Sequence, residues 1–192
     1  RLTEFLPLAK KYGAAILCLP IASDVPRTAP ERVAIIKTII NAAKKIGLTD
    51  TDFLLDALVM TVAADEIAAT ETMQTLKAYR EEFGYPSTMG LSNISYGLPN
   101  RPLMNSIFFA MNLACGLDAP IINPYDKTMQ DVLLTSSALL GYDKNAKEYS
   151  LTEANVETVV ATPTSPDTDI LTAIKNAVKN GEKELVADLV TT

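Results

Sequence analysis

Short apolar runs alternate with helix-like segments along the first 141 residues, and this alternation restricts the fold more than any other feature. Four runs predict buried strands: Ala14–Pro20, Phe53–Leu58, Thr88–Ser92 and Pro120–Asn123. Each is short, mostly apolar and bounded by turn or polar residues, as is typical of strands covered on both faces. They begin roughly 30 to 40 residues apart, which leaves room for a crossover helix and predicts a parallel sheet.

Helix signals fill the segments between these runs. Thr28 and Glu31 have the spacing of a capping box, while Asp65 and Asn100 can each cap a further helix. The predicted helices cover about residues 2–12, 28–46, 65–84, 101–115 and 127–140. Two architectures fit this α-βα-βα-βα-βα order: an open doubly wound sheet, or part of a (β/α)8 barrel.

The composition excludes several classes of function. Of the 192 residues, 48% are hydrophobic, so a well-packed core is expected. The net charge of −6 argues against a nucleic acid or an anionic membrane as partner, because both attract clustered Lys and Arg. No apolar run approaches the roughly 18 residues of a membrane-spanning helix. The chain has no His, so no Ser-His-Asp triad and no His-ligated metal are expected. Cys18 and Cys115 predict free thiols in a reducing, cytoplasmic compartment.

Polar residues follow the predicted strands, at the sheet edge where parallel α/β folds bind ligands. Asp56 interrupts an otherwise apolar segment, where an unpaired carboxylate is costly. It either caps a loop or pairs with a lysine, or it lies in a pocket and accepts two N–H bonds, for example from an amino-pyrimidinone. Asn93 is either a turn residue or a group that donates to and accepts from a ligand. Asn100 and Arg101 predict a helix cap followed by a solvent-facing cation.

The character of the sequence changes after residue 141. Residues 142–166 are polar, with Thr, Ser and Pro, and predict a linker. Residues 167–180 and 182–190 have helical patterns, but two such short helices cannot form a stable core alone. They predict the beginning of another domain. The chain begins with Arg1 rather than Met, which suggests a processed, truncated or excised piece of a longer protein.

Three segments resemble a known family of barrel domains. They are PLAKKYGAAILCLPIASDVPRTAPERV, FLLDALVM and MGLSNISYGLPNRPLMNSIFFAMNLACGLDAPIINPYD. The family comprises the pterin-binding barrels that bind methyltetrahydrofolate in cobalamin-dependent methionine synthase and in methyltetrahydrofolate:corrinoid methyltransferases. The GLSN-x-S-x-GLPNR string is long and specific, and the resemblance covers about residues 1–141. The tail DILTAIKNAVKNGEKELVADLV is similar, less specifically, to the start of the helical cap of a cobalamin-binding module.

The resemblance implies a fold, a domain order and an activity. The fold would be the C-terminal half of a (β/α)8 TIM barrel of the dihydropteroate-synthase type, with the four predicted strands as its last four; a whole barrel takes about 250 residues. Residues 1–141 would be this half barrel, 142–166 the linker and 167–192 the start of the helical cap. The implied activity is transfer of the N5 methyl group of methyltetrahydrofolate to a corrinoid cobalt. In a methionine synthase, the full protein then methylates homocysteine.

The resemblance also assigns roles to residues. Asn93 corresponds to the family asparagine near N5, where it would stabilise N5 as positive charge develops. Asp56 corresponds to the aspartate that holds the pterin ring. The loop from Ser92 to Arg101 would form a wall of the pocket. Further residues expected to line this pocket are Ser92, Ser95, Asn123 and Asp126.

The first four strands of such a barrel are absent, so an incomplete, inactive fragment is expected. Its open sheet edges would pair with the missing N-terminal half or with a second copy. Cobalamin would come from a corrinoid-binding domain or protein, with none bound by this chain. One alternative is a dihydropteroate-synthase-like pterin enzyme, which NPYD disfavours because it stands where a Lys/Arg-rich phosphate site is expected. The other is a non-catalytic interaction fragment.

Overall fold

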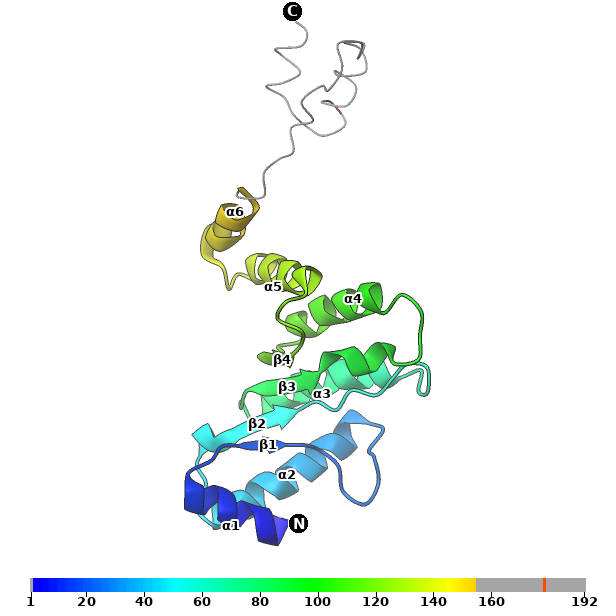
Figure 1. Cartoon of the computed structure of the whole chain (residues 1–192). Helices are drawn as coiled ribbons and strands as arrows, with labels where there is room; N and C mark the ends of the chain where they lie inside the picture. The colour runs from blue at the N-terminus through cyan, green and yellow to red at the C-terminus, as the bar shows by residue number, and fades with distance from the viewer. Residues whose placement is uncertain (1, 155–177, 179–192) are drawn as a thin grey trace, which may run out of the picture. The chain divides into compact units, whose positions relative to one another are not determined.

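The computed structural model describes residues 2–154 and residue 178. The chain divides into two compact units, Arg1–Tyr149 and Ser150–Thr192. The first unit contains a parallel sheet with strand order β1-β2-β3-β4 (Figure 1). Its strands are β1 (Ile16–Cys18), β2 (Phe53–Asp56), β3 (Ser87–Gly90) and β4 (Ala119–Ile121).

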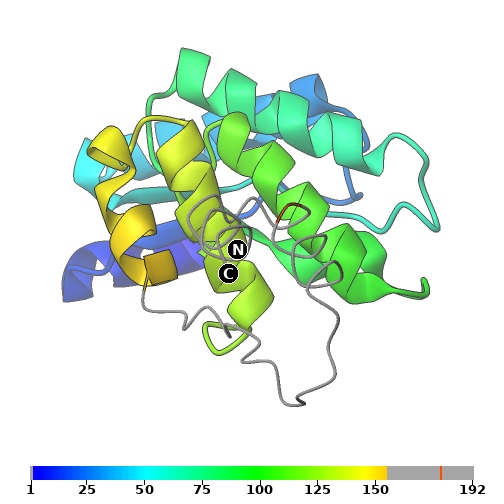
Figure 2. The ribbon, with the colours of Figure 1, turned by 90° about the horizontal axis from the view of Figure 1, so that it is seen from above.

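Each strand is followed by a helix, as the alternation of apolar runs and helix signals predicted. The α-helices are α1 (Leu2–Tyr12), α2 (Ala29–Lys45), α3 (Ala68–Glu82), α4 (Arg101–Ala114), α5 (Lys127–Leu139) and α6 (Lys147–Ala154). Short 3-10 helices are η1 (Asp50–Asp52), η2 (Leu91–Ser95) and η3 (Lys144–Ala146). The strands lie in the sheet in the same order as they occur in the chain. Successive crossovers therefore turn the same way, and their helices lie along one side of the sheet (Figures 1 and 2). This α/β arrangement is consistent with part of a TIM barrel.

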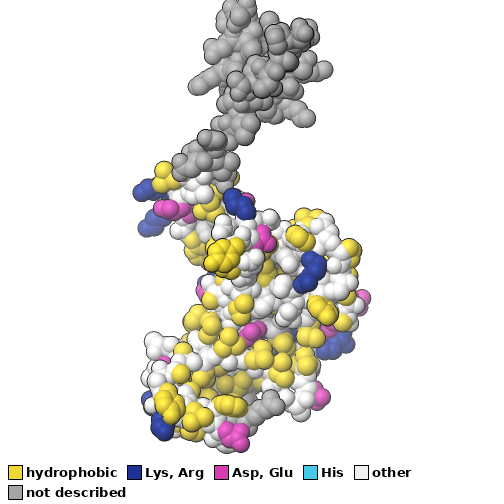
Figure 3. All heavy atoms as spheres, in the orientation of Figure 1, with side chains coloured by type: hydrophobic (Ala, Val, Ile, Leu, Met, Phe, Trp, Pro, Cys, Tyr) yellow, Lys and Arg dark blue, Asp and Glu magenta, His cyan; other side chains and the backbone are white. Residues whose placement is uncertain are grey.

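The two faces of the sheet differ, because side chains alternate along a strand. Phe53, Leu55 and Met89 point to the helices and are buried in the core. The opposite face carries Leu17 and Ile121, which are 49% and 56% exposed. Figure 3 shows hydrophobic side chains gathered over the part of the molecule where Figure 1 shows the strands. No described element covers this inner face, which is what an open segment of a barrel presents.

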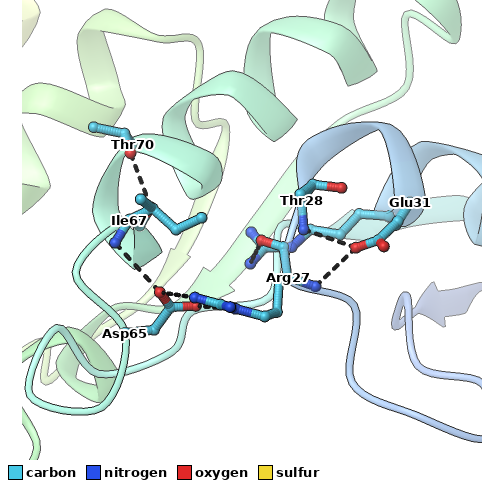
Figure 4. A network of polar contacts seen from close by, with 7 residues as sticks. Arg27, Thr28, Glu31, Asp65, Ile67 and Thr70 are labelled. Atoms are coloured by element: carbon cyan, nitrogen blue, oxygen red, sulfur yellow. Dashed lines mark hydrogen bonds and ion pairs between the residues drawn. The ribbon is translucent and has the colours of Figure 1, made fainter.

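The loops that follow β1 and β2 are joined by an ion pair (Figure 4). Arg27 donates to both carboxylate oxygens of Asp65, from Nη2 at 2.7 Å and Nε at 3.0 Å, and this guanidinium lowers the pKa of Asp65. Glu31 accepts the backbone N–H groups of Arg27 and Thr28, each at 3.0 Å, which confirms the predicted capping box. The backbone N–H of Thr28 is the main cause that lowers the pKa of Glu31.

Two predicted helix caps differ in the structure. α3 begins at Ala68 rather than at Asp65, because the Asp65 carboxylate is taken by Arg27 and by the N–H of Ile67. Asn100 does precede α4, but its backbone is left-handed, with φ of 49°, and its side chain makes no capping bond. Aspartate and asparagine are both common capping residues. Here the carboxylate of Asp65 is bound by Arg27, and Asn100 has a left-handed backbone.

The polar segment after residue 141 contains helical structure in its described part. Within the predicted linker of residues 142–166, η3 and α6 occupy residues 144–154. Asp143 explains this helix, because its carboxylate accepts the backbone N–H groups of Glu148 and Tyr149 at 3.1 and 3.0 Å. The Lys, Glu, Leu and Ala residues that follow also favour helix. The remainder of the linker lies outside the described residues, as does nearly all of the predicted cobalamin-module segment, residues 167–192.

Candidate functional site

The carboxyl ends of β2 and β3 form a corner on the inner face of the sheet. Asp56 is paired with Thr88 in the register of these strands, and Gly90 lies two residues beyond Thr88. Because side chains alternate, Asp56 and the Cα hydrogens of Gly90 share the inner face. Neighbouring strands are about 4.8 Å apart, so groups at these two strand ends can contact one small ligand.

Asn93 folds back over this corner because Gly90 has no side chain. The 3-10 helix η2 begins immediately after β3 and turns the chain at Gly90. A Cβ atom on Gly90 would lie 3.3 Å from Nδ2 of Asn93 and 3.9 Å from its Cγ. The Asn93 side chain is exposed, and within the described part of the chain its amide makes no hydrogen bond. Its donor and its acceptor are therefore both available to a ligand.

Asp56 is a half-buried carboxylate with one oxygen occupied. Oδ1 accepts the backbone N–H of Leu58 at 2.8 Å, whereas Oδ2 has no hydrogen-bond partner among the described residues. Burial raises the pKa of Asp56, and the Leu58 N–H partly opposes this. The loop-cap alternative is thus confirmed for one oxygen, and no described lysine pairs with the other.

The turn after Asp56 is strained. Leu58 has φ of 57°, a left-handed conformation that non-glycine residues rarely adopt. Such conformations cost on the order of 1–3 kcal/mol and persist only where the surroundings enforce them, most often at ligand-binding and catalytic sites. Strain beside a half-buried carboxylate favours a ligand-binding role for Asp56 over a purely structural one.

Arg32 of α2 fastens this turn from behind. Its side chain is 1% exposed, and Nη1 donates to the carbonyl oxygen of Ala57 at 3.1 Å and to Oγ1 of Thr75 at 3.4 Å. The hydroxyl of Tyr79 donates to the carbonyl oxygen of Asp56 at 3.1 Å. Burial lowers the pKa of Arg32. Sequence reasoning missed this residue, because a single arginine in a helix is typical of a solvated surface.

The polar groups of the GLSNISYGLPNR segment mostly bind one another. Arg101 donates from Nε to Oγ of Ser95 at 3.0 Å and from Nη2 to the carbonyl oxygen of Ser92 at 2.9 Å. Ser95 is fully buried and also donates to Oδ1 of Asn105 at 2.7 Å. Arg101 is exposed, as predicted, and it also ties η2, and with it Asn93, to the start of α4.

The predicted pocket residues after β4 have local partners. Oδ1 of Asn123 accepts the N–H of Tyr125 at 3.1 Å. Asp126 caps α5 and accepts the N–H groups of Thr128 and Met129. The structure thus places Asp56 at the end of β2 and the Asn93 amide beside Gly90 at the end of the adjacent strand β3, and it leaves Ser92 exposed next to Asn93 in the chain. It gives Ser95, Asn123 and Asp126 hydrogen bonds that serve loop, turn and cap.

Neither a metal-binding cluster nor a membrane-spanning helix occurs among the described residues. There, no three His, Cys, Asp or Glu side chains are grouped closely enough to hold a metal ion. The same residues include no helix with the length and apolar character needed to cross a membrane. Cys18 and Cys115 are both free thiols.

Comparisons with known proteins identify the family of the chain. Residues 2–123 match the family described as pterin binding enzyme. The chain belongs to this pterin-binding family. It is 33% identical over 131 residues to a methylcorrinoid:tetrahydrofolate methyltransferase of Eubacterium limosum. The aligned region covers 67% of this chain and 48% of that protein. It is 29% identical over 163 residues to methionine synthase of Mycobacterium tuberculosis, and this alignment covers 78% of this chain and 14% of that protein. For methionine synthase of Mycobacterium leprae, the identity is 32% over 132 residues, and the alignment covers 64% of this chain and 11% of that protein.

Family membership confirms the resemblance to pterin-binding barrels. The chain spans less than half the length of each of these relatives. Its position within a complete barrel, as the last four strands, stays a prediction. The roles of Asp56 and Asn93 are likewise predictions, now with a defined geometry.

Replacement of Arg32 by Met should destabilise the fold by about 2 kcal/mol or more, because the Ala57 carbonyl and the Thr75 hydroxyl lose a buried donor. Urea unfolding of the two proteins measures this difference. The matched control is Arg80→Met, since Arg80 is an exposed arginine whose contact with Asp118 is only 3.8 Å. That change should cost within about 0.5 kcal/mol. Equal stabilities of the two variants would contradict the structural role of Arg32.

Proposed function

We propose that the inner corner of β2 and β3 binds the reduced pterin of a folate, for methyl transfer between methyltetrahydrofolate and a corrinoid. One observation carries this proposal: Asp56, whose Oδ2 has no partner among the described residues, ends β2, and the unpartnered amide of Asn93 lies beside Gly90 at the end of the adjacent strand β3. Membership of the pterin-binding family supports the ligand class. The printed names of the relatives, which include a methylcorrinoid:tetrahydrofolate methyltransferase and methionine synthases, support the reaction class.

The two residues have different tasks in this proposal. The Asp56 carboxylate accepts N–H groups from the amino-pyrimidinone edge and fixes the pterin ring. The Asn93 amide hydrogen-bonds at N5. Loss or gain of a methyl group there changes the charge on N5, so a preoriented amide dipole stabilises the transition state. Because both directions share one transition state, the same residues serve transfer to or from the folate.

The corrinoid is proposed to come from another domain or protein. A corrinoid supplies the cobalt centre that exchanges the methyl group. The chain has no His that could act as a lower ligand to that cobalt. We propose the methionine-synthase-like direction, from methyltetrahydrofolate to the corrinoid, with homocysteine as the acceptor of the whole protein. The free thiols of Cys18 and Cys115 are consistent with a reducing, cytoplasmic compartment.

We further propose that the four strands are the last four of an eight-stranded barrel. The inner face of the sheet carries exposed apolar side chains, among them Leu17 and Ile121 at its two edges. Closing the barrel with four further strands would bury these side chains and pair the edges of β1 and β4. It would also supply the opposite wall of the pterin pocket.

Asn93→Ala and Asp56→Asn should each weaken binding of methyltetrahydrofolate by the full-length protein at least about tenfold, or ~1.4 kcal/mol. Calorimetric titration measures this loss. Asp56→Asn can keep the bond to the Leu58 N–H while losing the carboxylate, so unfolding in urea should show no loss of stability. Asn41→Ala is the matched control, since Asn41 is an exposed asparagine of α2 that is not among the pocket residues, and it should bind as the wild type does. Wild-type affinity in both test variants would refute the assigned roles.

Gly90→Ala tests the position of Asn93 without removing it. The backbone at Gly90, with φ of −79° and ψ of 89°, does not require glycine. The new Cβ would lie 3.3 Å from Nδ2 of Asn93, so the amide would have to shift by a few tenths of an ångström. Affinity for methyltetrahydrofolate should fall about tenfold, while stability stays within roughly 1 kcal/mol of wild type. Unchanged affinity would show that the observed Asn93 position is not the binding one.

The affinity should also depend on pH through Asp56. Only the ionised carboxylate accepts two N–H bonds, and burial raises the pKa of this group above its ordinary value. Binding should therefore be full above the raised pKa and decline as the pH falls through it, by up to about tenfold per pH unit. Titrations between about pH 4 and 8 measure this decline. In Asp56→Asn the decline should vanish, apart from any titration of the ligand itself; an identical profile in both proteins would contradict the assignment.

A further inference from the structure

The guanidinium of Arg101 is anchored on one edge and free on another. Nε donates to Oγ of Ser95 at 3.0 Å, and Nη2 donates to the carbonyl oxygen of Ser92 at 2.9 Å. A guanidinium has five N–H donors, so these two bonds leave three, which belong to Nη1 and Nη2. The residue is exposed, so these donors are available. A guanidinium held in this way can bind a carboxylate through two parallel N–H bonds.

Arg101 has no acidic partner in the described part of the chain. The loops after the four strands, with the first residue of each following α-helix, contain three basic residues: Arg27, Arg101 and Lys127. Arg27 pairs with Asp65. Lys127 pairs with Asp131, whereas no ion pair among the described residues involves Arg101. The sequence of residues 83–117 also contains no Asp or Glu, so the positive charge of Arg101 is left for an anion from outside the chain.

Arg101 lies close to the proposed position of N5. Its partner Ser92 directly precedes Asn93, whose amide is proposed to hydrogen-bond at N5. In a folate, N5 is bonded to C6, and C6 carries the aminobenzoyl-glutamate tail. A pterin ring placed by Asp56 and Asn93 therefore begins its tail beside η2, the segment to which Arg101 is tied. The tail ends in carboxylates, which are the groups that the free edge of this guanidinium is suited to bind.

The charge of the chain calls for a cation at this place. The net charge is −6, and Asp56 adds a half-buried carboxylate to the site itself. This field repels a ligand with a dianionic tail unless a local positive charge offsets it. We propose that Arg101 binds a glutamate carboxylate of the folate tail and so selects folates over pterins that lack the tail. This role rests on the proposed function of the inner corner.

Calorimetric titration of the full-length protein with two ligands separates this role from support of the loop. Methyltetrahydrofolate has the tail, whereas 5,6-dimethyltetrahydropterin keeps the N5 methyl group and has a second methyl group in place of the tail. Arg101→Gln removes the charge, so affinity for methyltetrahydrofolate should fall about tenfold more than affinity for the dimethyl pterin. Loosening of η2 would weaken the binding of both ligands alike.

Ionic strength gives a second measurement, and another arginine gives the control. Because Arg101 is exposed, raising the salt concentration from about 0.05 to 0.5 M should weaken wild-type binding of methyltetrahydrofolate more than binding of the dimethyl pterin. In Arg101→Gln the two ligands should respond alike. Arg80→Gln makes the same change at an exposed arginine whose neighbour Asp118 precedes β4, at the opposite end of the strands. It should change neither affinity.

The outcomes distinguish this inference from the proposed function. Equal losses for the two ligands in Arg101→Gln would overturn the tail site and leave Arg101 as a support of η2. Equal affinities of the wild type for the two ligands would also overturn it. Both results would leave the proposed function standing, because the pterin would still be bound. A wild type that binds neither ligand would overturn the proposed function and this inference with it.

Discussion

The candidate site depends on one buried guanidinium. Arg32 reaches from α2 to the carbonyl oxygen of Ala57, and it also bonds the carbonyl oxygen of Arg27 in the loop after β1. Ala57 lies between Asp56 and Leu58, so this one side chain fixes the carboxylate and the strained residue together. A guanidinium buried among carbonyl oxygens loses hydration that these bonds offset only in part. The packing of α2 and α3 against β2 must supply the rest, and the geometry of the site is therefore a property of the whole layer.

The features that sequence predicted are those set by local pattern. The alternation of apolar runs and helix signals predicted the strands β1 to β4 and the α-helices α1 to α5, because burial imposes these periods directly. The short 3-10 helices η1 and η2 were not predicted. Asp56 was recognisable as a charge within an apolar run. The residue at which a strand ends was harder to predict, because it depends on how far the strand pairs with its neighbour in the sheet. The run Thr88–Ser92 was expected to be extended, but β3 ends at Gly90, which pairs with the last residue of β4, Ile121.

The features that sequence could not predict depend on partners distant in the chain. Aspartate is a common capping residue, but the carboxylate of Asp65 accepts hydrogen bonds from Arg27, which lies 38 residues earlier in the chain. Arg101 is an exposed cation, as predicted, but its hydrogen bond to the carbonyl oxygen of Ser92 was not predicted. Arg32 gave no signal at all. The role of Asn93 rested on family resemblance, because from composition alone it could equally have been a turn residue.

The backbone around Asn93 is fixed while its amide stays free, and this contrast favours a preformed site. The N–H of Val62 donates to the carbonyl oxygen of Ile94 at 3.1 Å, and Oγ1 of Thr61 donates to that of Tyr96 at 2.7 Å. With Arg101 on the other side, η2 is held before any ligand arrives. A ligand then meets a backbone whose ordering entropy was already lost on folding, so only the Asn93 side chain has to be ordered on binding. For the proposed reaction, which changes the charge at one nitrogen, such a backbone would limit the reorganisation needed to place the amide at that nitrogen.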